Sequence, residues 1–166
     1  IRNLDFTNEN RFQHNNLFWN YRLSGLQASL GISQLNNLEK VIRLKRKQGT
    51  YYQKLFMDFS ELLSTQADSA YDVKNHYWVF GILLKKENIR NNLMKLLLDE
   101  GIETRPFFWP LHLQNALPDN FKNSSELLPV SVNLGKNGLY IPIGPHINKK
   151  NQRFIVRSLI KHIKTI

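Results

Sequence analysis

The sequence of 166 residues contains no cysteine. This absence excludes disulfide bridges, a thiol nucleophile and thiolate metal ligands. It is typical of a reducing compartment, and we therefore expect a cytoplasmic protein. A chain of this length corresponds to one domain, or to one domain with a helical extension, and can bury a sufficient core without covalent cross-links.

Long apolar runs are also missing from the sequence. No segment approaches the roughly 18–20 apolar residues that a membrane-spanning helix needs. The first ten residues, IRNLDFTNEN, include neither an initial Met nor the apolar core of a signal peptide. We therefore expect a soluble chain with no membrane partner. The abrupt start also leads us to expect that these residues belong to a longer protein.

General catalytic signatures are absent as well. The sequence has no Gly-rich phosphate loop, no Gly-x-Ser-x-Gly motif and no group of His, Asp and Glu at metal-ligand spacing. Its five histidines are far apart along the chain, and we expect no metal site. His162 falls within an amphipathic helical pattern, which predicts a position on the surface.

Acidic residues are scarce: 13 Asp and Glu stand against 23 Lys and Arg, which gives a formal net charge of +10. Such an excess favours polyanionic partners such as nucleic acid, anionic membranes or phosphorylated small molecules. The charges gather in EKVIRLKRKQ and NKKNQRFIVRSLIKHIK, where they complement an apolar face. Because no nucleic-acid-binding motif accompanies them, the pattern favours solvated helix faces over a nucleic-acid groove.

Apolar residues at helical spacing predict five helices. The helices are expected at Ser24 to about Leu35, about Leu38 to Phe56, Ile89 to the stop at Gly101, about Pro129 to the stop at Gly138, and about Lys149 onward. On the last helix, the expected apolar side comprises Phe154, Ile155, Leu159, Ile160 and Ile163.

Aromatic and β-branched residues predict a buried strand at His76–Leu84. Further strands are expected at Ile102–Phe107 and Leu139–Ile141, whereas residues 60–75 are expected to be a loop. The order of elements predicts an α+β fold with a small, mainly antiparallel sheet covered by helices. We expect two parts: residues 1–58 with a loop and dimer-interface helices, and residues 59–166 as a small domain.

Two stretches carry candidate binding residues. In FWNYRL, the amide of Asn20 and the guanidinium of Arg22 precede a helix start, where phosphate oxygens can bind. Spacing alone favours a simpler interpretation, in which Asn20 is a cap and Arg22 pairs with a carboxylate. In GIETRPFFWPLHLQ, Arg105, three aromatics and His112 form either a wall for a ring-shaped polar ligand or an aromatic-packed loop.

The order of five sequence blocks resembles the C-terminal half of a known family. RFQHNNLFWNYRLSGLQASLGISQL, a basic helix, HYWVFGILL, GIETRPFFWPLH and GLYIPIGP are similar to the DegT/DnrJ/EryC1/StrS family of pyridoxal-phosphate-dependent nucleotide-sugar aminotransferases. The resemblance implies the small domain of a fold-type I aminotransferase together with dimer-interface helices. It also implies pyridoxal 5'-phosphate as the cofactor and a homodimer as the assembly.

The resemblance implies roles for particular residues. Asn20 corresponds to the family's contact with the cofactor phosphate of the partner subunit, although Phe18 replaces a usual Gly two residues earlier. The implied substrate-binding residues are His14, Arg105, Phe107, Phe108 and His112. The family's cofactor-linked lysine lies in an N-terminal large domain and has no match here. We therefore expect no catalytic residue in this chain and no activity of the chain alone.

The implied reaction transfers an amino group from glutamate to a nucleotide-linked keto-sugar for polysaccharide or O-antigen biosynthesis. HYW and IETRPFFWPLH resemble perosamine-synthase-like members, which implies GDP-4-keto-6-deoxymannose as the substrate. The alternative is a non-catalytic basic domain that binds nucleic acid or a separately encoded catalytic half.

Overall fold

The computed structural model of the protein describes residues 21, 23–118 and 128–166. The chain divides into two compact units, Ile1–Glu39 and Lys40–Ile166. The predicted loop of residues 1–19 and the predicted site residues His14 and Asn20 lie outside the described residues. The proposed division near residue 58 stays a prediction.

The first unit contains helix α1 (Gly25–Leu35), which confirms the helix expected from Ser24. Ser24 caps it in a reciprocal arrangement with Gln27: the Gln27 N–H donates to the Ser24 Oγ over 3.2 Å, and the Ser24 N–H donates to the Gln27 Oε1 over 2.9 Å. No residue of α1 is buried. Apolar side chains that lie exposed on and beside this helix are those of Leu23, Leu26, Leu30, Ile32 and Leu35.

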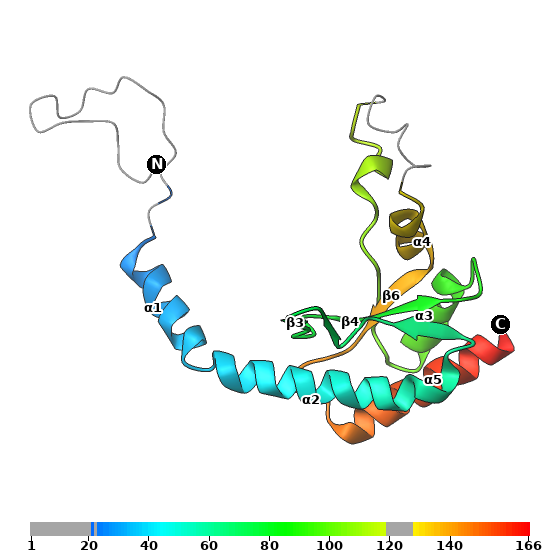
Figure 1. The fold of residues 1–166 in the computed structure, drawn as a ribbon, viewed down its shortest axis with the longest axis horizontal. Helices are drawn as coiled ribbons and strands as arrows, with labels where there is room; N and C mark the ends of the chain where they lie inside the picture. Colours follow the sequence, from blue (N-terminus) through cyan, green and yellow to red (C-terminus); the bar gives the residue numbers. More distant parts are fainter. Residues whose placement is uncertain (1–20, 22, 119–127) are drawn as a thin grey trace, which may run out of the picture. The chain divides into compact units, whose positions relative to one another are not determined.

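The second unit combines helices with two antiparallel sheets (Figure 1). Helix α2 (Leu38–Phe56) leads into it, and the helices that follow are η1 (Met57–Phe59), α3 (Arg90–Asp99), η2 (Leu111–Leu113), α4 (Pro129–Asn137) and α5 (Lys149–Thr165). The strands are β1 (Leu63–Thr65), β2 (Ser69–Ala70), β3 (Val73–Lys74), β4 (Phe80–Leu84), β5 (Arg105–Pro106) and β6 (Gly138–Ile141). The α+β prediction is therefore confirmed.

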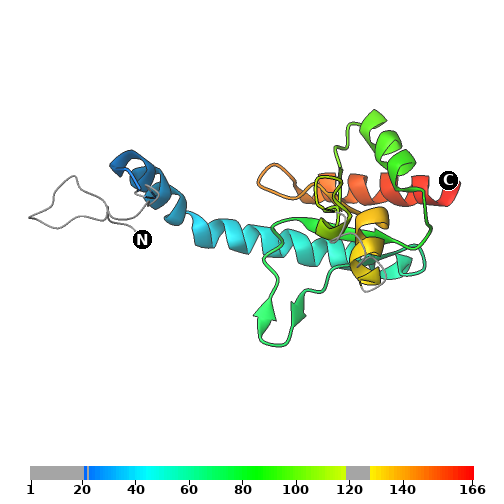
Figure 2. The same ribbon diagram turned by 90° about the horizontal axis from the view of Figure 1, so that it is seen from above.

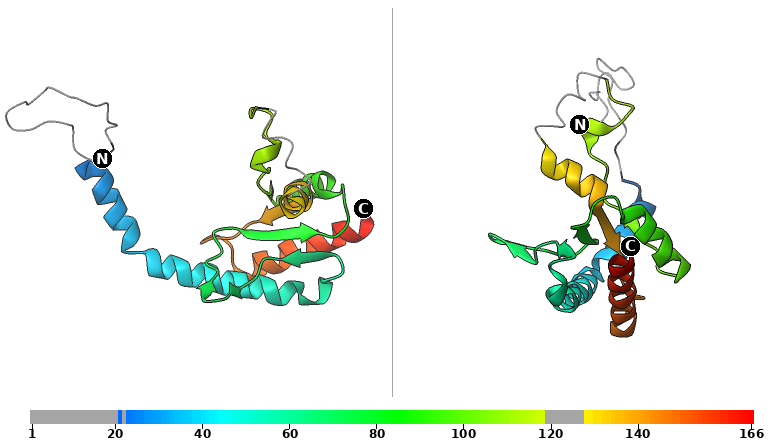
Figure 3. Two further views of the ribbon diagram at one scale, coloured as in Figure 1. Left: turned by 45° about the horizontal axis from the view of Figure 1, so that its top comes forward. Right: turned by 90° about the vertical axis from the view of Figure 1, so that its right-hand side faces the viewer.

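The main sheet has the strand order β1-β4-β6-β5, and every neighbouring pair is antiparallel. Strands β2 and β3 form a separate exposed hairpin that projects away from this sheet (Figure 2). Helices α2 and α5 lie side by side on one face of the main sheet, and α4 lies on the other side (Figure 3). Helices thus lie on both sides of the sheet.

The core lies between the sheet and helices α2, α3 and α5. Alternate residues of β4 point into it, because successive side chains of a strand face opposite sides. Its buried apolar residues are Tyr52, Phe56, Leu63, Tyr77, Phe80, Ile82, Leu84, Ile89, Leu93, Leu97, Ile102, Leu139, Ile141, Ile155, Val156, Leu159, Ile160 and Ile163. In the part of the chain that the structure describes, no helix is long and apolar enough to cross a membrane.

The predicted helices are confirmed, but the strand predictions need correction. Residues 60–75 are not simply a loop, because β1 pairs with β4 and the β2–β3 hairpin follows. The strand expected from His76 begins only at Phe80, since Tyr77 adopts a left-handed φ of 51° that interrupts an extended strand. The strand expected at Ile102–Phe107 is reduced to Arg105–Pro106.

Two predictions about α5 are also wrong in detail. Phe154, expected on the apolar side, is 50% exposed. The His162 side chain is only 12% exposed, because its Nε2 lies 2.8 Å from the Glu100 Oε1 at the end of α3. The polar contact between two helices explains why a histidine within an amphipathic pattern is partly buried.

Gln48 of α2 is a buried polar residue whose side chain and backbone both make hydrogen bonds to distant segments. Its Nε2 donates to the carbonyls of Gly144 over 2.7 Å and Ile147 over 2.6 Å, and its Oε1 accepts from the Gly144 N–H over 3.1 Å. Its own carbonyl accepts from the Gln152 side chain of α5 over 2.9 Å. One buried residue thereby fixes α5 and the loop that precedes it.

We predict that Gln48→Leu lowers the free energy of unfolding by about 2–5 kcal/mol, because three loop backbone groups lose their partner inside the protein. Urea unfolding followed by circular dichroism measures the change. Gln34→Leu on the exposed α1 is the control and should stay within about 0.5 kcal/mol of the wild type. A Gln48→Leu loss below about 1 kcal/mol would contradict the structural role of this side chain.

The Glu100 carboxylate, at the end of α3, makes polar contacts with side chains of α5. Hydrogen bonds from Ser158, Lys161 and His162 hold the pKa of Glu100 at about 2. The Lys161 Nζ lies 3.1 Å from the same carboxylate oxygen as His162. A lowered carboxyl pKa means that the contact stabilises the folded state above the unfolded-state pKa of about 4.3 and that this stabilisation is lost as the pH falls towards 2.

We therefore predict that wild type and Glu100→Gln differ in unfolding free energy at pH 7 and converge between about pH 5 and pH 2. Urea unfolding at several pH values checks this. Glu87→Gln, which removes an exposed carboxylate outside this contact, serves as the control. A difference that persists unchanged to pH 2 would show that the Glu100 charge does not carry the effect.

Candidate functional site

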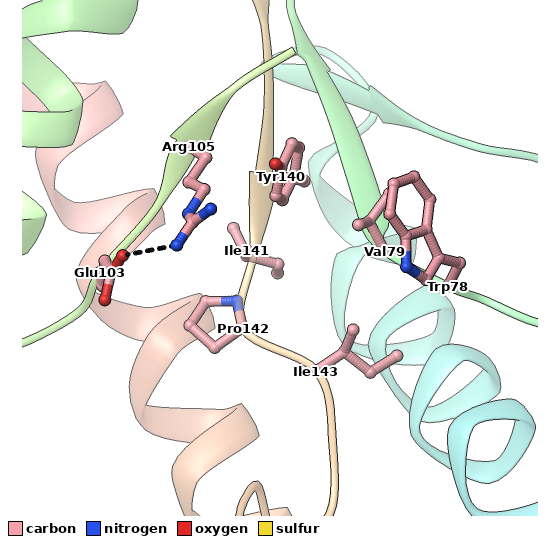
Figure 4. A pocket seen from close by; sticks show the side chains of 8 residues that line it. All are labelled: Trp78, Val79, Glu103, Arg105, Tyr140, Ile141, Pro142 and Ile143. Carbon is pink, nitrogen blue, oxygen red and sulfur yellow. Dashed lines mark hydrogen bonds and ion pairs between the residues drawn. The ribbon is translucent and has the colours of Figure 1, made fainter. Parts of the chain in front are cut away.

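A hollow of about 260 Å³ opens where β4 and β5 begin and β6 ends (Figure 4). We call it the aromatic hollow, and its lining residues are Trp78, Val79, Glu103, Arg105, Tyr140, Ile141, Pro142 and Ile143. Figure 4 shows Arg105 and Glu103 on one side and Trp78 on the other, with Tyr140 and Pro142 between them. A charged side and an aromatic side thus face a shared space.

Strand pairing places the residues of the aromatic hollow. Arg105 of β5 is opposite Tyr140 of β6, and Tyr140 is opposite Gly81 of β4. Directly opposed residues of antiparallel strands project from the same face, so the Arg105 and Tyr140 side chains emerge together. Gly138 allows β5 and its continuation to approach β6, because a Cβ there would lie 2.9 Å from the Phe107 Cβ.

Arg105 is the cation of the aromatic hollow, and it is only weakly held. Its Nη2 lies 3.4 Å from the Glu103 Oε1, and the two side chains are 66% and 72% exposed. Water screens such a surface pair strongly, so it contributes little to stability. The planar guanidinium can therefore turn to a carboxylate or phosphate of a ligand, which it binds with two parallel N–H groups.

Aromatic rings form the opposite wall. The Trp78 ring, 70% exposed, stacks on Phe108 with centroids 6.0 Å apart and planes inclined by 10°. Phe108 in turn lies 6.2 Å from the Tyr140 ring. Exposed flat rings beside a charged group are typical of pockets that orient a small polar ligand.

The core fixes the backbone that carries Trp78. The preceding Tyr77 is fully buried, and its hydroxyl donates to the Asp68 Oδ1 over 2.5 Å. Lys45 of α2 donates to the Trp78 carbonyl over 2.7 Å, and burial lowers the pKa of this lysine. The aromatic side of the hollow is therefore anchored from α2 as well as from the sheet.

The structure separates the predicted substrate residues. Arg105 lines the aromatic hollow, and Phe108 supports it by stacking on Trp78. Phe107 lies in a different hollow, beside Gly81. His112 is buried, and its Nε2 has no hydrogen-bond partner among the described residues. Their binding roles, like those of His14 and Asn20, stay predictions.

Of the lining residues that sequence reasoning did not predict, three have polar or aromatic side chains: Trp78, Glu103 and Tyr140. The sequence pattern places Trp78 within a buried strand and Tyr140 within a short one. No sequence pattern marks the backbone turn at Tyr77 that exposes Trp78. Glu103 stands two residues before Arg105, a spacing that puts both side chains on one face of an extended segment.

The chemistry of the aromatic hollow is that of binding and orientation. No lysine is among its lining residues, and it contains no serine, threonine or histidine that could act as a nucleophile or base. In the described ranges, no group of three or more His, Asp and Glu side chains could hold a metal ion. The hollow offers a guanidinium, a carboxylate, a phenol and two apolar walls.

Comparisons with known proteins show which sequences the chain is similar to. GDP-perosamine synthase of Escherichia coli O157:H7 is 28% identical over 149 residues, which cover 90% of this chain and 39% of that protein. GDP-4-keto-6-deoxy-D-mannose 3-dehydratase of E. coli O55:H7 is 29% identical over 129 residues, which cover 74% of this chain and 32% of that protein. The chain thus spans about two fifths or less of the length of these curated relatives.

The fold also matches a solved structure. The putative sugar aminotransferase Spr1654 from Streptococcus pneumoniae, in its PLP form, superposes with a TM-score of 0.75 at 17% identity. The superposition covers 87% of this chain and 36% of that protein. The sequence profile of the DegT/DnrJ/EryC1/StrS aminotransferase family matches residues 1–160. The chain therefore belongs to the DegT/DnrJ/EryC1/StrS aminotransferase family.

Proposed function

We propose that this chain is the C-terminal portion of a pyridoxal-phosphate-dependent enzyme that aminates a nucleotide-linked keto-sugar. The proposed substrate is GDP-4-keto-6-deoxymannose, the proposed amino donor is glutamate, and the proposed setting is cytoplasmic polysaccharide or O-antigen biosynthesis. The observation that carries the proposal is the placement of Arg105 opposite Trp78 across the aromatic hollow. The names of the two curated relatives, both concerned with GDP-sugars, support the substrate class.

The walls of the aromatic hollow suit the two parts of such a substrate. A sugar ring has an apolar face of C–H groups, which can lie against the exposed Trp78 ring. A nucleotide-linked sugar also carries phosphate charge, which the Arg105 guanidinium can bind in place of Glu103. Binding at both points would orient the keto carbon relative to the rest of the active site.

The described residues do not by themselves fit the cofactor. No lysine lines the aromatic hollow, and its carboxylate, Glu103, lies beside Arg105 rather than free to pair with a ring nitrogen. When bound, pyridoxal phosphate supplies the electron sink for amine transfer. In this proposal other parts of the enzyme hold it, and Asn20 donates to the phosphate of the partner subunit's cofactor. The PLP and PMP forms of Spr1654 support this cofactor.

The proposal predicts that Arg105→Ala in the full-length enzyme raises the KM for the nucleotide keto-sugar by about tenfold to a hundredfold, because a charge-assisted contact is lost. The effect on kcat should be smaller, since the guanidinium binds the substrate and does not take part in amine transfer. Steady-state kinetics measure both constants, and mass spectrometry identifies the product as an amino sugar.

Arg157→Ala is the matched control, because Arg157 is an exposed cation of α5 that does not line the aromatic hollow. Its KM should equal that of the wild type. The 166-residue chain assayed alone should show no turnover. An unchanged KM for Arg105→Ala would argue against substrate binding at this hollow, and a deoxygenated keto-sugar product would favour a dehydratase over an aminotransferase.

We also propose that α1 contributes to a homodimer interface. Five apolar side chains on or beside this 11-residue helix are 60–75% exposed, and such a concentration is unusual for a surface that faces only water. A second copy of the chain can cover the same apolar face in a symmetric contact. In a two-fold symmetric homodimer, both subunits contribute the same surface patch. One substitution therefore changes the interface at two places.

We predict that Leu30→Glu on α1 shifts the protein from dimer to monomer, because each dimer would then place two carboxylates at an apolar contact. Sedimentation velocity over a concentration series measures the change. Ser33→Glu introduces the same charge on α1 at an already polar exposed position and should leave the dimer intact. A wild-type protein that stays monomeric at high concentration would contradict the interface.

A further inference from the structure

A second hollow, of about 690 Å³, lies on α2 next to the first turn of α5. We call it the basic hollow, and its lining residues are Arg46, Lys47, Thr50, Tyr51, Lys54, Asp68 and Lys149. It shares no residue with the aromatic hollow. Residues about one helical turn apart on α2 supply five of the seven, which explains why the cations gather on one side of the helix.

The positive charge of the basic hollow is poorly compensated. Four cationic side chains line it, whereas Asp68 is its one carboxylate and already accepts the Tyr77 hydroxyl. Within the described ranges, none of the four cations has a carboxylate at ion-pairing distance. Because like charges held together repel, a bound anion would stabilise this arrangement.

Two cationic side chains of α5 contact Tyr51. The Lys149 Nζ lies 5.4 Å from the Tyr51 ring centroid, and the Arg153 Nη1 donates to the Tyr51 hydroxyl over 3.1 Å. The first turn of α5 has no acidic residue and begins with Lys149 and Lys150. Since the N-terminal end of a helix is itself positive, this segment adds to the field in the hollow.

The lining also indicates the chemistry of the ligand. Arginine and lysine bind phosphate oxygens strongly, and the Thr50 hydroxyl adds a neutral donor. Its lining has no Leu, Ile, Val, Phe or Trp, which are the side chains that peripheral proteins insert into a membrane.

We propose that the basic hollow binds the diphosphate group of a small molecule. The contacts are the side chains of Arg46, Lys47, Lys54 and Lys149, with Arg153 positioned by Tyr51 at the rim. This proposal does not depend on the reaction of the enzyme, because it rests on the charges and geometry of α2 and α5 alone.

Calorimetric titration of the 166-residue chain with sodium pyrophosphate tests the proposal. Ionic strength is held constant with NaCl, because salt screens exposed charges. Saturable binding is expected for the wild type, and the double variant Lys54→Gln/Lys149→Gln should bind at least about tenfold more weakly. Both lysines are exposed, so the variant should retain the circular dichroism spectrum of the wild type.

The matched control is Lys95→Gln/Lys136→Gln, which removes the same charge at exposed positions outside the hollow. Its affinity should stay within about twofold of the wild type. Tyr51→Phe keeps the ring but removes the Arg153 acceptor, and should weaken binding by a smaller factor than the double variant.

Three results would overturn the proposal. The first is the absence of saturable pyrophosphate binding by the wild type. The second is an equal loss in the two double variants, which would reflect overall charge rather than a site. The third is binding only to vesicles containing phosphatidylglycerol, or only to nucleic acid, which would assign the charge to a macromolecular surface.

Discussion

The buried carboxamide of Gln48 is the contact on which the rest of the second unit depends. It satisfies backbone groups of Gly144 and Ile147, and its carbonyl receives the Gln152 side chain. A buried polar group is stabilising only when its partners are all present, so this arrangement is highly specific. The loop it holds begins at the floor of the aromatic hollow and ends at α5, where the basic hollow begins. One side chain of α2 thus holds the loop that connects the two hollows.

The two hollows use charge in different ways. In the aromatic hollow a single guanidinium stands among rings beside a carboxylate, which suits selective recognition of one ligand group. In the basic hollow several cations share a space with little opposing charge, which favours any compact polyanion. The formal net charge of the chain is +10. Part of it is concentrated where α2 and α5 meet.

Helices could be predicted from the sequence because their signals are local. The cap at Ser24 and the left-handed Gly101 that follows α3 are each encoded within a few residues. The short strands β1 and β5 were missed or overextended because their existence depends on pairing with distant partners, β4 and β6. Arg105 could be proposed as a site residue from its aromatic surroundings and from the family resemblance. Trp78 could not, because the backbone turn at Tyr77 that exposes it leaves no pattern in the sequence.

The left-handed backbone at Tyr77 places a buried residue directly before an exposed residue of the aromatic hollow. The Tyr77 ring packs so closely on α2 that any Cβ at Gly49 would overlap it, whereas the neighbouring Trp78 ring projects outward. Adjacent residues are thus under opposite constraints. Position 78 can change to suit a new ligand without disturbing the core, while positions 49 and 77 must vary together. Ligand preference can therefore change at a position one residue away from a tightly packed support.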